Sequence, residues 1–336
     1  MKNERIAVLG AGSWGTALAN LLAASGREVA LWARDEALVD TLQKHRENIR
    51  FLPGFPLHPN IAPTSDLNTA VSSARIVLFA IPSGGIRQVA IRAQAALEPH
   101  ALIVSASKGL EDGTGLRMSQ VLAEIIPNST NRIAALSGPN LALEIAQGAP
   151  AASVAASVES ATAKAVQKLF TGQQHPTFRV YTGTDVIGVE LGGAVKNVIA
   201  IGAGICDGLG FGDNSKAALM TRGLTEAIRL GKAMGAEPET FLGLSGVGDL
   251  IATGASRLSR NYRVGFALGK GGRLETILQD LGQVAEGVPT THVLCDLATK
   301  SEVEMPLCNA LHSVLFEFRD PKEVIRELMS RPQRRE

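Results

Sequence analysis

The chain has 336 residues, enough for two domains with separate cores, and a hydrophobic content of 45% that is typical of a compact α/β protein and excludes extensive disorder. A net charge of +1 and an aromatic content of 4% give no case for a nucleic-acid-binding surface or for attraction to an anionic membrane. The cysteines and histidines lack the spacing of a disulfide framework or a metal site, so we expect no metal.

The N-terminal sequence MKNERIAVLG leads directly into a strand pattern, so we expect no signal peptide. Charges or several glycines interrupt every apolar segment before it reaches the length of a membrane span, which predicts no membrane insertion. Together with the unpaired cysteines, these features predict a cytoplasmic protein.

The first half of the chain alternates strand and helix patterns, which is typical of a parallel sheet covered on both faces. The expected strands are continuous apolar runs, as in strands buried on both sides. They lie at 5–10, 28–34, 75–81, 101–107, 132–138, 151–157 and 177–183. Helix patterns lie between them at 14–25, 35–47, 84–96, 116–125 and 159–170. The proline-rich segment 51–65 predicts a surface loop without a helix.

A glycine motif, Gly10-Ala11-Gly12-Ser13-Trp14-Gly15, follows the first strand and opens a helix. In this context Gly10 permits a tight turn, Gly12 lets the backbone approach a pyrophosphate, and Gly15 lets helix and strand pack closely. The helix N-terminus supplies amide donors for the phosphates. The motif predicts a dinucleotide site, the alternative being a glycine-rich turn without a ligand.

Arg34 ends the second strand, where a site that prefers NAD would carry an acidic residue for the ribose hydroxyl. An arginine at this position can accept a 2′-phosphate or stack on adenine, so NADPH is allowed. Asp35 follows immediately and leaves the preference open. The alternative for Arg34 is a solvated residue at the start of a helix.

Two further segments follow expected strands, at the sheet edge where ligands bind in open α/β folds. Pro82 follows the third strand in chain order, and Lys108 follows the fourth. Lys108 can meet an anion or a carbonyl oxygen there, or lie exposed in a loop. Asn140, in the sequence SGPN after the next strand, can hydrogen-bond a substrate or cap the following helix, and local evidence favours capping.

After about residue 184 the strand-like runs stop and helix patterns take over. They cover 185–208, 215–234, 260–269, 273–281 and 289–300. Asp213, Asn214 and Ser215 are suitable N-caps for a helix that starts at 216, and Gly235 is placed to end it. The predicted fold is α/β: a Rossmann-like, doubly wound sheet in residues 1–184, followed by an all-helical domain in residues 185–336.

Lys196 lies in the long apolar helix pattern without a carboxylate three or four positions away. Gly192 and Gly193 leave open space beside it, and Asn197 adds a second polar group. A desolvated lysine has a lowered pKa, which suits it to proton transfer near neutral pH. The alternative is a lysine whose amino group extends to the surface.

Two polar segments of the second half can complete such a site. Asp249, flanked by glycines, either caps a short helix at 250–255 or orients Lys196. Arginines recur at every third position from 257 to 263, which on the start of a helix makes a basic ridge for a phosphate, or else a solvated charged face.

Taken together, these motifs resemble the NAD(P)-dependent glycerol-3-phosphate dehydrogenases of the bacterial, soluble type, over essentially the whole chain. The segments that carry the resemblance are GAGSWGTALA at 10–19, SKGLE at 107–111, SGPN at 137–140, ELGGAVKNVIAIGAGICDGLGFGDNSKAAL at 190–219, GVGDL at 246–250, LSRNYRVG at 258–265 and VAEGV at 284–288.

The resemblance implies an oxidoreductase that interconverts dihydroxyacetone phosphate and sn-glycerol 3-phosphate with NAD(P)H and supplies phospholipid synthesis. Lys196 would transfer the proton, held in place with the substrate hydroxyl by Asn197, Asp249 and Thr253. The substrate would contact Lys108, Gly138, Asn140, Lys196, Asp249, Ser259, Arg260 and Asn261. The cofactor would contact Gly10, Gly12, Ser13, Trp14, Gly15, Arg34, Pro82, Lys108, Ala142, Arg260, Val284 and Glu286.

Two departures from the family pattern stand out: Asn140 replaces the serine of many bacterial members, and the pair Gly84-Gly85 follows Pro82. Two alternatives remain, a dehydrogenase of the 3-hydroxyacid or ketopantoate type and a non-catalytic protein that senses NADP. The basic ridge argues against the first, and the pair Lys196-Asn197 argues against the second. The oligomeric state stays open, with a homodimer as one possibility. We expect Lys196 to lie where the two domains meet, within reach of Asp249.

Overall fold

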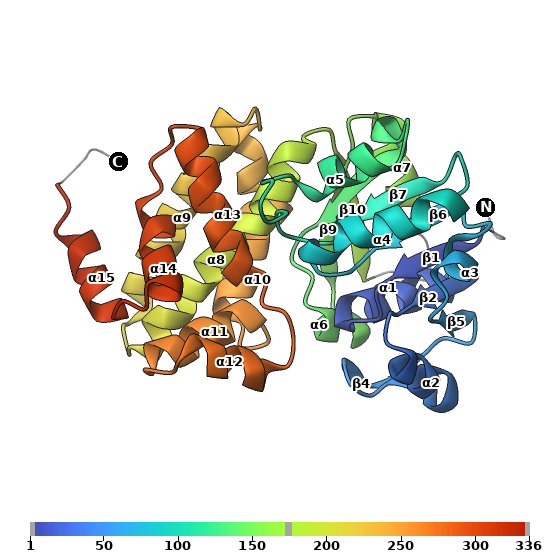
Figure 1. Ribbon diagram of the computed structural model, residues 1–336, viewed down its shortest axis with the longest axis horizontal. Helices are drawn as coiled ribbons and strands as arrows, with labels where there is room; N and C mark the ends of the chain where they lie inside the picture. The colour runs from blue at the N-terminus through green and yellow to red at the C-terminus, as the bar shows by residue number, and fades with distance from the viewer. Residues whose placement is uncertain (1–3, 172–176, 333–336) are drawn as a thin grey trace. The chain divides into compact units, whose positions relative to one another are not determined.

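A computed structural model describes residues 4–171 and 177–332 of the chain, which Figure 1 follows from blue to red. The chain forms two compact units. The first unit consists of Met1–Lys108 and Leu116–Glu190, and the second of Gly109–Gly115 and Leu191–Glu336. The functional boundary expected between residues 184 and 185 remains a prediction.

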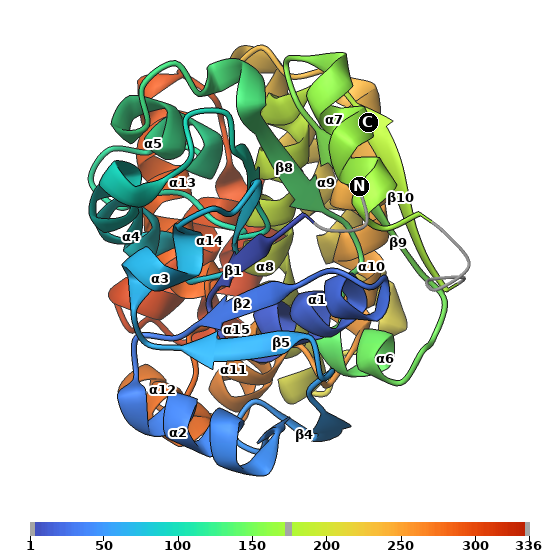
Figure 2. The same ribbon diagram turned by 90° about the vertical axis from the view of Figure 1, so that its right-hand side faces the viewer.

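An eight-stranded sheet forms the centre of the first unit, with the strand order β10-β9-β8-β7-β6-β1-β2-β5 (Figure 2). The strands are β1 (Ile6–Leu9), β2 (Val29–Trp32), β5 (Ile61–Thr64), β6 (Ile76–Phe79), β7 (Leu102–Ser105), β8 (Ile133–Ser137), β9 (Ala151–Ala156) and β10 (Phe178–Gly183). Each of the seven expected apolar runs contains one of these strands. All neighbours pair in parallel except β8 and β9, which are antiparallel.

The segment 51–65 differs from the expected loop. It forms no helix, as predicted, but it contains β5 and β4 (Leu52–Pro56), which pairs with the short strand β3 (Glu47–Asn48). β5 pairs only with β2 and ends the sheet, so Pro63 can occupy a strand without interrupting a ladder on both sides. The prolines in segment 51–65 argued against a strand, so this edge strand was not predicted from the sequence.

Helices cover both faces of the sheet, because alternate residues of each strand point to opposite faces. Along β1, Ile6 and Val8 pack in one core cluster, whereas Ala7 and Leu9 pack in another. The first cluster includes residues of α1 (Ser13–Ala24), α2 (Glu36–His45), α6 (Ala142–Ala146) and α7 (Ser160–Leu169). The second includes residues of α3 (Leu67–Val71), α4 (Ile86–Ala93) and α5 (Met118–Ile125). The doubly wound prediction is confirmed, although the short helices α3 and α6 were not predicted.

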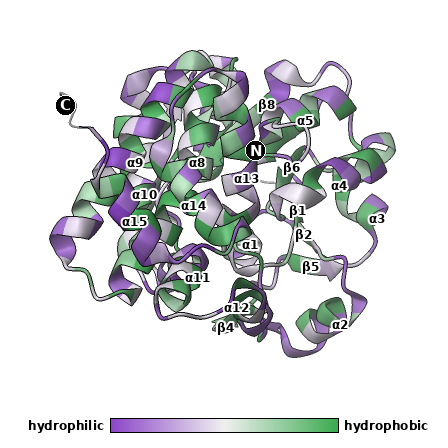
Figure 3. Ribbon diagram, turned by 60° about the vertical axis from the view of Figure 1, so that its left-hand side comes forward, coloured by the Kyte–Doolittle hydropathy of each residue, from purple (hydrophilic) through white to green (hydrophobic). Residues whose placement is uncertain are grey.

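The second unit is helical, and no strand follows β10 in the described residues. The helices of this unit mostly bury one face each, so green and purple residues alternate along most of them in Figure 3. They are α8 (Val186–Gly208), which begins in the first unit, α9 (Asp213–Ala233), α10 (Asp249–Ala255), α11 (Arg260–Gly269), α12 (Leu274–Leu281), α13 (Gly287–Lys300), α14 (Pro306–Phe316) and α15 (Pro321–Met329).

Three helices of this unit differ from the expectation: α9 in where it begins, and α14 and α15 because they were not predicted. α9 begins at Asp213 with Gly212 as its N-cap, so Asp213, Asn214 and Ser215 lie inside the helix and do not precede it. Its C-terminus agrees with the prediction, because Gly235 has a φ of +89°, which favours glycine.

Among the described residues, one helix, α8, has the length and composition to cross a membrane. Within the structure, 94% of its apolar window is buried. Burial in a protein core explains this composition without a bilayer, because a helix that is apolar all round is typical of both environments.

Candidate functional site

The glycine motif forms a tight turn between β1 and α1. Gly10 has a φ of +118°, and a Cβ atom there would lie 2.5 Å from the carbonyl oxygen of Ala80. A Cβ on Gly15 would lie 1.8 Å from the carbonyl oxygen of Gly10, so this glycine is required for close packing. Around Gly12, in contrast, no atom lies within 4 Å of a Cβ position. The turn therefore leaves open space where a pyrophosphate would approach.

The first turn of α1 is suited to an anion. Gly12 is its N-cap, with no side chain that occupies the amide donors and no acidic residue in the first turn. Trp14 lies partly buried beside Phe178, and its indole Nε1 is buried without a hydrogen-bond partner. Amide donors, the helix dipole and open space at Gly12 together fit a dinucleotide diphosphate, with Ser13 at the start of the helix.

Arg34 is exposed beyond the end of β2, as expected for a residue that contacts the adenosine part of a cofactor. Asp35 has a structural role, because its carboxylate caps α2 through the amides of Ala37 and Leu38. This carboxylate also forms an ion pair with Arg50, at 3.3 Å. Asp35 is therefore engaged by the protein, which leaves Arg34 as the charged residue available at the strand end.

Lys108 and Gly138, both expected to bind substrate, are in contact. The Nζ atom of Lys108 donates a hydrogen bond to the carbonyl oxygen of Gly138, at 2.8 Å. Gly138 has a φ of +146°, and a Cβ there would lie 2.8 Å from the carbonyl oxygen of Ala152, so glycine is needed. Pro82 is exposed just before a short 3-10 turn at Ser83–Gly85. The hydrogen bond to Gly138 holds Lys108 in place, so this lysine does not lie free in an exposed loop.

Asn140 does not cap the following helix, contrary to the expectation from its position. α6 has Leu141 as its N-cap and begins at Ala142, and no side chain caps it. Its Oδ1 accepts a hydrogen bond from the hydroxyl of Ser153, at 2.7 Å. Its Nδ2 is buried and has no hydrogen-bond partner. An unused buried donor is rare in proteins, so this amide fits a ligand oxygen.

In the second unit, Lys196 is buried together with Asp249 and Thr253. Their exposures are 8%, 2% and 3%. The ammonium Nζ lies 2.7 Å from the hydroxyl of Thr253 and 3.1 Å from the carboxylate of Asp249. The hydroxyl in turn donates to the same carboxylate oxygen, at 3.1 Å. The expected contact between Lys196 and Asp249 is confirmed, and the alternative of an amino group that extends to the surface is wrong.

The surroundings of Lys196 differ from the expectation in two respects. Asp249 is the first residue of α10, with Gly248 as its N-cap, so it does not cap this helix. Gly192 does not leave open space, since a Cβ there would lie 2.8 Å from the carbonyl oxygen of Ser245. The glycine instead allows α8 to approach the π-helical turn at Leu244–Gly248, which directly precedes Asp249.

Asn197 and Asn261 extend this polar centre. The Nδ2 of Asn261 donates to the Oδ1 of Asn197, at 2.8 Å, and its own Oδ1 accepts from the backbone amide of Gly287, at 2.9 Å. A Cβ on Gly287 would lie 2.6 Å from the carbonyl oxygen of Asn197. Sequence reasoning did not assign Gly287 to the site, although it lies inside the motif VAEGV.

The start of α11 carries the other predicted phosphate ligands. Ser259 is 5% exposed and caps the helix by accepting a hydrogen bond from the amide of Tyr262. Arg260 is exposed, although desolvation of its guanidinium lowers its pKa and the charge of Glu286 raises it. An arginine remains charged at neutral pH despite such effects. Glu286 directly precedes α13, and Val284 is 44% exposed.

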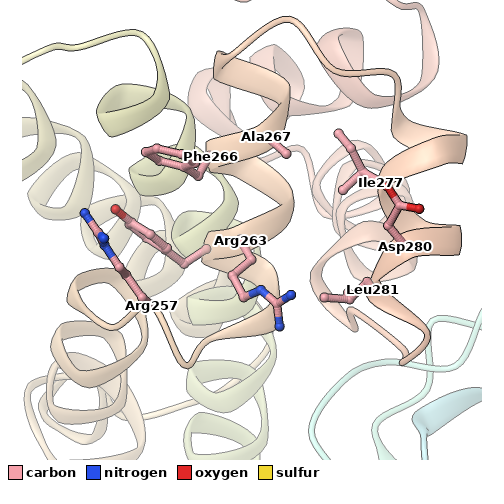
Figure 4. Close-up of a pocket in the computed structure, with 8 residues that line it drawn as sticks. Arg257, Arg263, Phe266, Ala267, Ile277, Asp280 and Leu281 are labelled. Atoms are coloured by element: carbon pink, nitrogen blue, oxygen red, sulfur yellow. The ribbon is translucent and has the colours of Figure 1, made fainter.

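The three arginines do not form one helical ridge. α11 begins at Arg260, so Arg257 lies before the helix. Arg257 and Arg263 line a cavity of about 390 Å³ beside α11 and α12, shown in Figure 4. Its remaining lining residues are Tyr262, Phe266, Ala267, Ile277, Asp280 and Leu281. Of the three arginines expected in the ridge, two thus line this separate cavity, and only Arg260 lies at the start of α11 beside Asn261.

The predicted site residues thus form two sets. The first unit contributes the glycine turn and the strand-end residues, and the second contributes the centre around Lys196 and the start of α11. Within the described part of the chain, no group of three or more His, Cys, Asp or Glu side chains is arranged to hold a metal ion.

Comparison with known proteins places these residues in one family. Two family models match, NAD-dependent glycerol-3-phosphate dehydrogenase N-terminus over residues 5–163 and the corresponding C-terminus over residues 185–326. A glycerol-3-phosphate dehydrogenase (NAD(P)+) of Desulfitobacterium hafniense is 48% identical over 332 residues, which cover 99% of this chain and 93% of that protein. The equally named protein of a Geobacter species is 50% identical over 329 residues, with coverages of 98% and 97%.

Solved structures agree with these matches. The crystal structure of glycerol-3-phosphate dehydrogenase from Coxiella burnetii has a TM-score of 0.93 and 40% sequence identity, and it covers 98% of this chain and 100% of that chain. A ketopantoate reductase from Ralstonia eutropha has a TM-score of 0.60 at 16% identity, with coverages of 97% and 99%. The second likeness concerns the fold alone.

Proposed function

The chain belongs to the NAD-dependent glycerol-3-phosphate dehydrogenase family, and from this premise we propose how its residues perform the reaction. The enzyme is an oxidoreductase that interconverts dihydroxyacetone phosphate and sn-glycerol 3-phosphate with NAD(P)H. Reduction of the ketone requires a hydride for its carbon and a proton for its oxygen. When bound, NAD(P)H supplies the hydride, and the protein supplies the proton and the positions of the reactants.

Lys196 is the residue that we assign to the proton. In the reduction it donates a proton to the carbonyl oxygen, and in the reverse direction it accepts the proton of the hydroxyl. The carboxylate of Asp249 lies 3.1 Å from this ammonium and holds it in place. Thr253 fixes the direction of the ammonium by a hydrogen bond at 2.7 Å. This buried triad is the observation that carries the proposal.

The substrate phosphate is assigned to the start of α11. Arg260 offers a planar guanidinium that can bind two phosphate oxygens at once. Asn261 is 7% exposed and already tied to Asn197, so it connects the phosphate ligands to the residue next to Lys196. Binding energy from the phosphate would thus position the carbonyl group for reaction.

The cofactor is assigned to the glycine turn of the first unit. Open space at Gly12 and the uncapped N-terminus of α1 fit the pyrophosphate. Arg34 and the engagement of Asp35 in a helix cap support acceptance of NADPH as well as NADH. Asn140 contributes a free amide donor for a ligand oxygen.

A steady-state assay tests this function. Oxidation of NADH and of NADPH is followed separately with dihydroxyacetone phosphate, with dihydroxyacetone and with ketopantoate as substrates. We expect turnover with dihydroxyacetone phosphate and a kcat/KM for dihydroxyacetone that is lower by at least about 10²-fold, because a phosphate clamp contributes several kcal/mol. Equal rates with the unphosphorylated ketone would contradict the clamp. Preference for ketopantoate would support the alternative dehydrogenase, and absence of turnover would support a sensor.

The biological setting belongs to the same proposal. We assign the product to phospholipid synthesis and the enzyme to the cytoplasm, where a protein with three free cysteines remains reduced. A homodimer is the assembly that sedimentation of the purified protein would test.

A further inference from the structure

Two cysteine side chains join α13 to α14 in the second unit. The Sγ atoms of Cys295 and Cys308 lie 3.6 Å apart, and the residues are 13 positions apart in the chain. Both cysteines are free. A disulfide bond has an S–S distance of about 2.05 Å, so the two sulfurs are in contact but not bonded.

The two thiols differ in their access to solvent. Cys295 is partly exposed, whereas Cys308 is 2% exposed. The sulfur of Cys308 also lies 3.8 Å from the carbonyl oxygen of Thr291. A reagent from solution therefore meets Cys295 before it meets the buried thiol of Cys308.

The hydrogen bond between the thiols also makes Cys295, the more exposed thiol, the more reactive one. A hydrogen bond from Cys308 lowers the pKa of Cys295, against the effects of burial and of the carboxylates of Asp296, Glu226 and Glu317. The same interaction and burial raise the pKa of Cys308 well above its ordinary value. Since the thiolate is the nucleophile, Cys295 is the thiol that attacks an oxidant.

A metal-binding role does not explain the pair. His292 and His312 lie close by, with ring nitrogens 3.2 Å apart. Nevertheless, no group of three or more potential ligands in the described ranges is arranged around a metal position. Two adjacent thiols, one accessible and one buried, are instead typical of an attacking and a resolving cysteine.

We propose that Cys295 and Cys308 form a site of reversible oxidation, at which a hydroperoxide is reduced and a disulfide links α13 to α14. The Cys295 thiolate attacks the terminal peroxide oxygen, and the O–O bond breaks. The Cys295 sulfur keeps the O–H group as a sulfenic acid, and the leaving alkoxide takes up from water the proton that Cys295 released on ionisation, which gives an alcohol. The sulfur of Cys308 then attacks the Cys295 sulfur, the S–O bond breaks, and hydroxide leaves with the Cys308 proton as water. Two thiols lose two electrons in total, and the peroxide gains them.

The third cysteine provides an internal control. Cys206 is 3% exposed, and burial together with the charge of Asp207 raises its pKa to about 11. Its sulfur has no thiolate character at neutral pH, so the same oxidant should leave it unchanged. The three cysteines lie in separate tryptic peptides, 197–216, 274–300 and 301–319, because lysines or arginines separate them.

The test is a disulfide map of the wild-type enzyme. The protein is treated with one equivalent of hydrogen peroxide, alkylated, digested with trypsin without reduction and analysed by mass spectrometry. We expect a cross-linked species of peptides 274–300 and 301–319, full alkylation of Cys206, and loss of the cross-link after treatment with dithiothreitol. A cross-link that is absent while Cys295 is converted to sulfinic acid would overturn the proposal, as would oxidation of Cys206 at the same rate.

Two variants separate the roles of the thiols. Cys295→Ser should leave Cys308 reduced at the same peroxide concentration, because the remaining thiol is buried. Cys308→Ser should still react, and it should accumulate the sulfenic acid of Cys295, trapped with dimedone. The reverse result, with Cys308 oxidised in the absence of Cys295, would contradict the assignment. The wild-type map decides the existence of the disulfide independently of how either variant folds.

Discussion

Lys196 brings a charged group into an apolar helix, and two side chains from α10 compensate for its burial. Isolated charges are costly inside proteins, and a buried ion pair is tolerated when its remaining hydrogen-bonding positions are also satisfied. The ring formed by Lys196, Asp249 and Thr253 meets this condition with three contacts of 2.7 to 3.1 Å. Such an arrangement fixes the direction of the ammonium, which suits a proton donor better than a flexible surface lysine would.

Arg260 allows a test of the phosphate site with a control on the same helix. In Arg260→Ala, the KM for dihydroxyacetone phosphate should rise by roughly 10- to 100-fold, because a hydrogen-bonded charge is removed. The matched control is Arg263→Ala, since Arg263 lines the separate cavity beside α12. Steady-state kinetics should show a KM close to that of the wild type for this variant. An equal rise in both variants would indicate a general electrostatic effect and contradict a specific clamp.

At the scale of elements, the continuous apolar runs predicted the strands well, because strands buried on both faces need no alternation. The edge strand β5 was missed, because its prolines are tolerated only where one side of the strand is unpaired. The short helices α3 and α6 were missed because five residues are too few to show a helical period. In each miss, the tertiary position of the segment determined its structure.

The glycine turn before α1 predicts opposite outcomes for two alanine substitutions. In Gly15→Ala, the new methyl group would overlap the carbonyl of Gly10, so the free energy of unfolding should fall by about 1–3 kcal/mol. In Gly12→Ala, the methyl group would meet no protein atom, so stability should be retained. It would instead displace the pyrophosphate, and kcat/KM for NAD(P)H should fall by an amount of order 10²-fold.

Urea unfolding and cofactor kinetics on both glycine variants check this pair. A stable Gly12→Ala enzyme with unchanged cofactor kinetics would remove the support for a pyrophosphate at this turn. Full stability of Gly15→Ala would show that the close packing of β1 and α1 can relax.

Glu226 provides a pH-dependent contribution to the packing of α9 against α14. Its carboxylate is 5% exposed and accepts hydrogen bonds from the amides of Leu307 and Cys308. Burial raises its pKa from 4.5 to about 7, although these amides and the charges of Arg229 and Arg331 oppose the effect. Because the folded state holds the proton more tightly than the unfolded state, this carboxyl stabilises the fold below pH 4.5. The stabilisation is lost as pH rises through about 7.

The expected size of this effect is roughly 3 kcal/mol at most, from the difference between the two pKa values. Urea unfolding of the wild type and of Glu226→Gln between pH 4.5 and 8 measures it. We expect the wild type to lose stability relative to the variant as pH rises over this range. The control Glu275→Gln, at an exposed position on α12, should leave the pH dependence of the wild type unchanged. Parallel curves for the wild type and Glu226→Gln would contradict the prediction.

Across the whole molecule, the sequence motifs identified which residues belong to the site but not which residues they contact. The contact between Lys196 and Thr253 spans 57 positions, and that between Asn197 and Asn261 spans 64. Local periodicity carries no information about such pairs. The family resemblance implied the contact of Thr253 with Lys196, whereas no prediction paired Asn197 with Asn261. Gly287 was missed for the same reason, since its backbone amide acts only through the tertiary contact with Asn261.

For Asn140, the local sequence context predicted the wrong role. Its position after β8 and before a helix favoured capping, which is the common use of asparagine there. The structure turns its side chain toward Ser153 of the antiparallel strand β9. A parallel sheet was expected throughout, so the antiparallel pairing that places Ser153 next to Asn140 was not anticipated.

We propose that Lys196 transfers the proton in the reduction of dihydroxyacetone phosphate. Its most direct test is the kcat of Lys196→Ala with saturating NADH and substrate, together with the melting temperature and a fluorescence titration of NADH to verify folding and cofactor binding. We predict that kcat falls by at least about 10²-fold, the scale of general acid–base catalysis, while NADH still binds. Turnover close to that of the wild type in a folded Lys196→Ala enzyme would show that another group transfers the proton.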